Sequence, residues 1–82
     1  MMAWDWDVET TNSVSLQIAE LPADECDRLN GVLIDMAQLD HQKPHSGEAV
    51  RRTRVLTPGW RFWWLVMNDP DTIIVWKIER EG

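Results

Sequence analysis

The fold is decided by one stretch of this sequence, RRTRVLTPGWRFWWLV, which runs from Arg51 to Val66. It contains four of the chain's eight Lys and Arg residues and three of its six tryptophans. Thr57-Pro58-Gly59 in its middle is typical of a turn, and the residues on either side alternate with the period of a β-strand. The stretch therefore predicts a hairpin closed at residues 57–59.

The alternation assigns the side chains of this hairpin to two faces. In the second strand, one set is apolar and is expected in the core: Trp60, Phe62, Trp64 and Val66. Arg61 and Trp63 have the opposite parity, so we expect them on an open face of the sheet. In the first strand we expect Arg52 and Arg54 beside Arg61 on that face, with Thr53 and Val55 in the core.

The residues before the hairpin predict a strand and two helices. AWDWDVE (residues 3–9) alternates apolar and acidic residues, as a half-buried strand does. The next segment has Thr11, Asn12 or Ser13 as a possible N-cap, and an apolar spacing of three and four residues predicts a helix up to residue 21. After Pro22 a second helix is expected, capped by Asp24, with a long apolar stripe over residues 26–41.

The residues after the hairpin predict one more strand. Residues 41–48 form a loop, Asn68–Asp71 a turn, and Thr72–Arg80 a run rich in branched and aromatic residues. The order β-α-α-β-β-β predicts a single α+β domain over residues 1–82, with an antiparallel-rich sheet and both helices on one face. Two sets of side chains are expected to meet in the core: Thr53, Val55, Trp60, Phe62, Trp64, Val66 and Ile74 from the sheet, and Leu16, Leu29, Leu33 and Met36 from the helices.

Composition limits the kind of protein. Eighty-two residues suffice for one small domain, and the single cysteine, Cys26, cannot form an intramolecular disulfide, so we expect a cytoplasmic protein without a membrane segment. The formal net charge is −6. Residues 1–50 have ten carboxylates against two cations, a net of −8, whereas residues 51–82 have six cations against four carboxylates, a net of +2. Contact with a polyanion must therefore be local.

Three arginines on one open face would suit a phosphate or a carboxylate, because guanidinium is always charged and presents a planar fork of donors. The alternative is that these arginines solvate an edge strand or pair with nearby carboxylates. No metal or cofactor site is predicted, because Cys26 has no second cysteine and His41 and His45 have no third ligand at a recognisable spacing.

The predicted element order and a basic-to-aromatic motif resemble the RelE/ParE superfamily of small bacterial toxins. The motif consists of Arg52 and Arg54, Gly59-Trp60-Arg61 and Ile78-Glu79-Arg80, and the first strand adds Asp5-Trp6-Asp7. The resemblance implies that Arg52, Arg54, Arg61 and Arg80 contact the scissile phosphate of mRNA in the ribosomal A site.

The implied reaction needs no metal: the 2′-hydroxyl of the RNA attacks the adjacent phosphate while arginines stabilise the growing charge. Arg54, Arg61 and Arg80 would then be catalytic, with Arg52 and Trp63 binding the substrate. The chain has no tyrosine, and arginine is a poor base, so His45 and Glu48 are the acid/base candidates. His41 and Glu79 are further candidates, and the alternative is that His41, His45 and Glu48 are solvated loop residues.

The resemblance also implies partners. A toxin of this type is neutralised by a cognate antitoxin, expected to lie over the sheet or the helix layer and to contact Trp63 and Trp76. Its target would be the ribosome with mRNA, or another protein, because members of the ParE kind bind DNA gyrase without the catalytic set. The sequence therefore leaves two functions open. One is a toxin-like endoribonuclease of a type II toxin-antitoxin module, and the other is a non-catalytic protein-binding module of the same fold, either a ParE-like gyrase inhibitor or an orphan or phage-borne interaction protein.

Overall fold

The helices and strands follow the predicted order. The computed structural model describes residues 6–38, 44–45, 47–68 and 71–81. Its elements are β1 (Asp7–Thr10), α1 (Asn12–Ala19), α2 (Ala23–Met36), β2 (Ala49–Thr57), β3 (Trp60–Met67) and β4 (Thr72–Arg80). Two helices and a four-stranded sheet confirm the predicted α+β class. Neither helix within these described ranges is long and apolar enough to cross a membrane.

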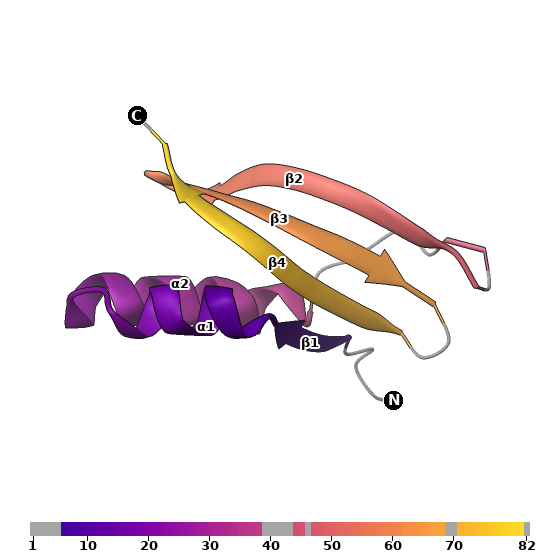
Figure 1. Cartoon of the computed structure of the whole chain (residues 1–82), viewed down its shortest axis with the longest axis horizontal. Coiled ribbons are helices and arrows are strands. Elements are labelled where there is room, and N and C mark those ends of the chain that lie inside the picture. The colour runs from indigo at the N-terminus through magenta and orange to yellow at the C-terminus, as the bar shows by residue number, and fades with distance from the viewer. Residues whose placement is uncertain (1–5, 39–43, 46, 69–70, 82) are drawn as a thin grey trace.

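The sheet is mixed, with strand order β1-β4-β3-β2. β1 pairs in parallel with β4, whereas β3 pairs antiparallel with both β4 and β2. The two helices lie on the same side of this sheet and form the second layer (Figure 1). β2 is an edge strand, so one of its sides has no neighbouring strand in the described part of the chain.

The helix boundaries confirm one predicted cap and correct the other. Thr11 caps α1, and its side chain accepts a hydrogen bond from the backbone N–H of Val14 at 3.3 Å. α2 begins directly after Pro22, which takes the N-cap position without a side-chain hydrogen bond, so the prediction of Asp24 as the cap was wrong. Proline has a fixed φ that suits a helix start, and it allows the helix to begin earlier than the polar cap suggested.

The core lies between β3, β4 and the helices, and the alternation of β3 is confirmed. Trp60, Phe62, Trp64 and Val66 are buried, as are Leu29 and Met36 of α2. Leu16 was predicted in this core but is 64% exposed. α1 buries Val14 and Ile18, which are four residues apart, and a residue midway between them points to the other side of the helix.

A β-bulge at Leu56 reverses the predicted faces of β2. Thr57 pairs with Trp60, but the next pair is Val55 with Arg61, so β2 has one residue more than β3 between these pairs. Beyond an extra residue of this kind, each side chain of the strand points to the face opposite to the one that an unbroken alternation predicts. Thr53 and Val55 were predicted in the core and instead lie on the Arg61 side, where both are exposed.

A second bulge, at Trp76, does the same in β4. Trp63 pairs with Lys77 and Trp64 pairs with Val75, which leaves Trp76 as the extra residue. Ile73, Val75 and Ile78 are therefore the buried residues of this strand. Ile74, predicted in the core, pairs with Leu65 on the opposite face and is only partly buried. The β2–β3 turn itself needs Gly59, whose φ of 89° favours glycine.

Candidate functional site

The structure divides the four predicted phosphate-binding arginines between the two faces of the sheet. Arg52 is paired with Trp64 and Arg54 with Phe62, so both have the parity of the core side chains. Arg80, opposite Trp60, also lies on the helix side. Arg61 alone points to the other face. The expectation that Arg52 and Arg54 share the open face with Arg61 was therefore wrong, and the bulge at Leu56 is the reason.

Arg61 is held by neighbours on its own face. Its Nε donates to Glu81 Oε2 at 3.3 Å, and its Nη1 donates to Thr53 Oγ1 at 3.2 Å. The Arg61 side chain is about one third exposed. The guanidinium is thus oriented and already paired with a carboxylate, so an incoming anion would have to compete with Glu81.

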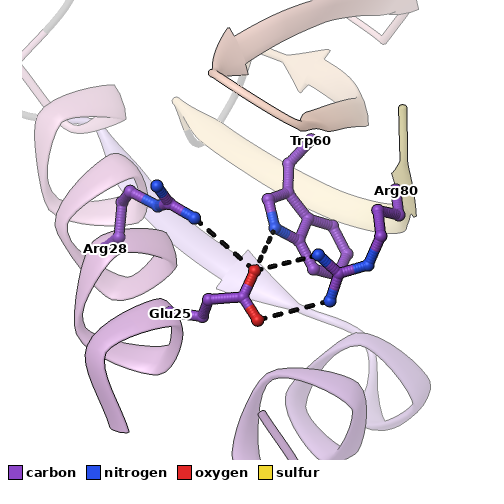
Figure 2. Close-up of polar contacts among 4 residues, drawn as sticks. All are labelled: Glu25, Arg28, Trp60 and Arg80. Carbon is purple, nitrogen blue, oxygen red and sulfur yellow. Dashed lines mark hydrogen bonds and ion pairs between the residues drawn. The ribbon is translucent and has the colours of Figure 1, made fainter. Parts of the chain in front are cut away.

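Arg80 belongs to a four-residue cluster at the junction of α2 and the sheet (Figure 2). Its Nη1 and Nη2 donate to the two carboxylate oxygens of Glu25 at 3.0 and 3.3 Å, and its guanidinium lies 4.6 Å from the centre of the Trp60 ring. The indole of Trp60 donates to Glu25 at 3.3 Å, and Arg28 does so at 3.5 Å. Donors from α2, β3 and β4 converge on one carboxylate, and the cluster joins α2 to the start of β3 and the end of β4.

The electrostatics of this cluster favour the charged pair. The hydrogen bond from Arg80, and next that from Trp60, lowers the pKa of Glu25 from its usual value of 4.5. The hydrogen bond to Glu25 raises the pKa of Arg80. Both shifts have the sign expected when a hydrogen bond stabilises the ionised form. The Arg80 guanidinium is therefore engaged in an ion pair with Glu25.

Replacing Glu25 with glutamine is expected to flatten the dependence of stability on pH. Because the pKa of Glu25 is lower in the folded than in the unfolded chain, the ionised carboxylate stabilises the fold above the unfolded value and loses this effect as pH falls through the folded value. Urea unfolding between about pH 5 and about pH 3 should show a steeper loss of stability for the natural chain than for Glu25→Gln. Glu20→Gln is the control, since Glu20 has no ion pair within the described residues. Equal slopes for the two variants would contradict the role assigned to Glu25.

The edge strand β2 has three arginines without a carboxylate partner. Arg51, Arg52 and Arg54 are exposed, and none of their side chains makes a hydrogen bond or ion pair with any residue that the structure describes. By contrast, all other described cations are paired with carboxylates: Arg28 and Arg80 with Glu25, Arg61 with Glu81, and Lys77 with Glu79. Among the described residues, the positive charge that is not paired with a carboxylate is therefore concentrated on β2.

The acid/base candidates His45 and Glu48 are not brought to Arg61. The backbone N–H of Glu48 donates to the carbonyl of His45 at 3.0 Å, and both residues are exposed just before β2. Arg61 lies beside Val55, which is seven residues after Glu48, or about 23 Å at about 3.3 Å per residue. His41, and Asp5 of the family motif, lie outside the described residues. Within the described ranges, no three His, Cys, Asp or Glu side chains could hold a metal ion.

The sheet side opposite the helices is a surface of its own, which we call the open face. It has apolar residues at its centre and charged ones around them: Val55, Trp63, Leu65, Ile74 and Trp76, with Arg51, Arg61, Lys77 and Glu79. None of these side chains is fully buried, and Val55 and Trp76 are 41% and 36% exposed. The ammonium of Lys77 lies 4.7 Å from the centre of the Trp63 ring. No element of the described chain covers this face (Figure 1).

Sequence reasoning found part of the open face. It placed Trp63 beside Arg61, which is confirmed, and it named Trp76 as a contact residue without assigning it to a face. It missed Arg51, Leu65 and the hollow between Arg51, Leu65 and Trp76. The two bulges were the missing information, because each reverses a strand's faces without an obvious signal such as glycine.

Comparison with protein-family models, curated protein sequences and solved structures finds no match to this chain. Membership of the RelE/ParE superfamily therefore stays a prediction, based on the motif residues.

Proposed function

We propose that this chain is a non-catalytic protein-binding module, of the kind that the toxin-like resemblance implies, and that it binds a partner protein in the cytoplasm through the open face. The main support is the uncovered apolar centre of this face, Val55, Trp63, Leu65, Ile74 and Trp76. A contiguous apolar patch with charged residues at its rim is typical of a protein interface, and tryptophan and arginine are the residue types that contribute most there.

The arrangement of the charged residues favours binding over catalysis. A phosphoryl-transfer site needs several donors around one phosphate and a proton carrier within hydrogen-bond reach. Here Arg61 and Arg80 are on opposite faces and are each paired with a carboxylate, Glu81 and Glu25. Of the proton carriers suggested by the sequence, His45 and Glu48 lie before the start of β2, more than about 20 Å along the strand from Arg61 at about 3.3 Å per residue, and Glu79, opposite Arg61, is paired with Lys77.

An endoribonuclease is the second candidate, and one observation favours it. Arg51, Arg52 and Arg54, which have no carboxylate partner in the described part of the chain, give β2 a local positive potential, which attracts the phosphates of RNA despite the net charge of −6. In this function the cognate partner would be an antitoxin and the target the ribosome with its mRNA. Arg52 and Arg54 would hold the phosphate, and Trp63 could stack on a base.

Translating ribosomes incubated with the purified protein are expected to keep their mRNA intact. The reason is that His45 and Glu48 lie before the start of β2, far along the strand from Arg61, and that the carboxylates nearest to Arg61 and Arg80 are held in ion pairs. Primer extension on the mRNA measures cleavage, with a ribosome-dependent endoribonuclease of the RelE type as the positive control. Induced expression in a bacterium, followed for growth and transcripts together, extends the test to the cell.

The matched variant for this assay is Arg61→Ala. If the natural chain cleaves mRNA and Arg61→Ala is about 100-fold slower or worse, the protein is an endoribonuclease and our proposal is wrong. Growth arrest with intact transcripts would support a protein target. Unchanged growth would contradict the toxin-like part of the proposal and leave a binding module without toxicity.

A further inference from the structure

The open face has a hollow where its partner could place one side chain. Arg51 of β2, Leu65 of β3 and Trp76 of β4 line it, and its volume is about 140 Å³. The three residues come from neighbouring strands, so the hollow lies across the sheet and not along one strand. It is separate from the cluster of Glu25 and Arg80, which lies on the helix side.

The bulge in β4 explains why a hollow is present at this position. Arg51 is opposite Leu65, and Leu65 is opposite Ile74, so the three form one row across the open face. Trp76 is the extra residue between Val75 and Lys77, and its indole lines the hollow next to this row. In a regular strand the side chains would alternate without interruption, whereas here the indole of Trp76 is an extra side chain outside that alternation.

The size and lining of the hollow define the side chain that fits. An apolar cavity of about 150 Å³ in another protein binds benzene, so the present volume suits one aromatic ring or one branched aliphatic side chain. Leu65 and Trp76 provide apolar contact. Insertion of a partner's side chain here would remove apolar surface from water on both molecules.

The charge of Arg51, beside the hollow, indicates which group the partner would place next to its inserted side chain. Arg51 is exposed and has no carboxylate partner in the described chain. It lies on the open face, one residue before Arg52 on the other face. A partner carboxylate next to the inserted side chain would neutralise Arg51. A long polyanion is less suitable, because Glu79 and the acidic β1 residues Asp7 and Glu9 are on the same face.

From these observations we infer that the partner contributes a short acidic segment with one apolar anchor, which fills the hollow at Leu65 and Trp76 and places a carboxylate against Arg51. This inference rests on the proposed function and adds to it the chemistry of the bound segment. It identifies the ligand as an acidic peptide segment and not as RNA.

The test uses the full chain and a capped pentapeptide with a central phenylalanine between glutamates. Two further peptides are matched controls, one with a central alanine and one with lysines in place of the glutamates. NMR titration should show shifts at the indole N–H of Trp76 and the methyl groups of Leu65. We expect the alanine peptide to bind at least about 10-fold more weakly, since a buried anchor dominates a small interface.

Two adjacent arginines provide a matched pair of variants. Arg51→Ala should weaken binding of the glutamate peptide by up to about 5-fold, the range for an exposed ion pair. Arg52→Ala should leave it unchanged, because Arg52 is also exposed and has no carboxylate partner among the described residues, but lies on the other face. Trp76→Ala should weaken binding at least about 10-fold.

Several results would overturn the inference. Equal effects of the Arg51 and Arg52 variants, or equal binding of the lysine peptide, would mean that Arg51 selects no carboxylate. Binding that depends on Trp63 and not on Arg51 or Trp76 would overturn this segment site and leave the proposed function standing. If an oligouridine shifts the open-face resonances and none of the peptides does, both the inference and the proposed function are wrong.

Discussion

Replacing Phe62 with alanine is expected to lower the free energy of unfolding by about 3–5 kcal/mol, the range for truncating a buried aromatic side chain. Phe62 is fully buried in β3, with Ile78 opposite it in β4 and the helix layer over it. A domain of this length has a total stability of about 4–12 kcal/mol, so the loss is a large part of what is present. Urea unfolding followed by circular dichroism measures the change directly.

The control for Phe62 is Leu16→Ala in α1. Leu16 is 64% exposed, and alanine is the best helix former, so this variant should stay within about 0.5 kcal/mol of the natural chain. Both residues were expected in the core from the sequence. Comparable losses at the two positions would mean that α1 packs through a different side from the one in this structure.

The pair also shows how far the sequence determines the core. Along β3 the alternation of Trp60, Phe62 and Trp64 with Arg61 and Trp63 is unbroken, and every residue is on the predicted face. Eight residues with a strict period of two leave one register that buries the aromatic set. In α1, Val14 and Ile18 are four residues apart and lie on the same side of the helix, so both are buried. Leu16 lies midway between them and faces the other side. The eight-residue helix has only one side to bury.

The faces of β2 could not be predicted because their period is interrupted. Leu56 adds a residue close to the turn, and Arg52 and Arg54 thereby change places with Thr53 and Val55. Every residue from Arg51 to Arg54 is charged or polar, so no apolar pattern within this segment fixes its register. The predicted cluster of three arginines depended on that register, and it was lost with a single inserted residue.

The cluster around Glu25 could not be predicted for another reason. Glu25 and Arg80 are 55 positions apart, and their contact depends on how α2 lies over the end of β4. Local patterns specify helices and strands, and they do not specify which charged residues meet when the layers pack. A pairing of this kind follows only from the three-dimensional arrangement, which also shows that Arg80 is already engaged with Glu25.

The double variant Trp63→Ala/Trp76→Ala is expected to reduce affinity for a protein partner at least about 100-fold. Each indole offers a large rigid surface on the open face, and central tryptophans in interfaces commonly contribute about 2 kcal/mol or more each. The first partner to test is the product of a neighbouring gene, where the cognate antitoxin of a toxin-like protein is expected. Titration by calorimetry measures the affinity, and circular dichroism confirms that the variant is folded.

The matched control removes two apolar side chains from the helix layer. Leu16 and Ile34 are 64% and 66% exposed, more than either indole, so Leu16→Ala/Ile34→Ala deletes an accessible apolar pair from the other layer. The sequence left open whether a partner lies over the sheet or over the helices, and this comparison distinguishes the two. Full affinity in the control with loss in the tryptophan variant identifies the open face as the interface. The reverse result would place the partner on the helices, and the open face would then need another explanation for its uncovered tryptophans.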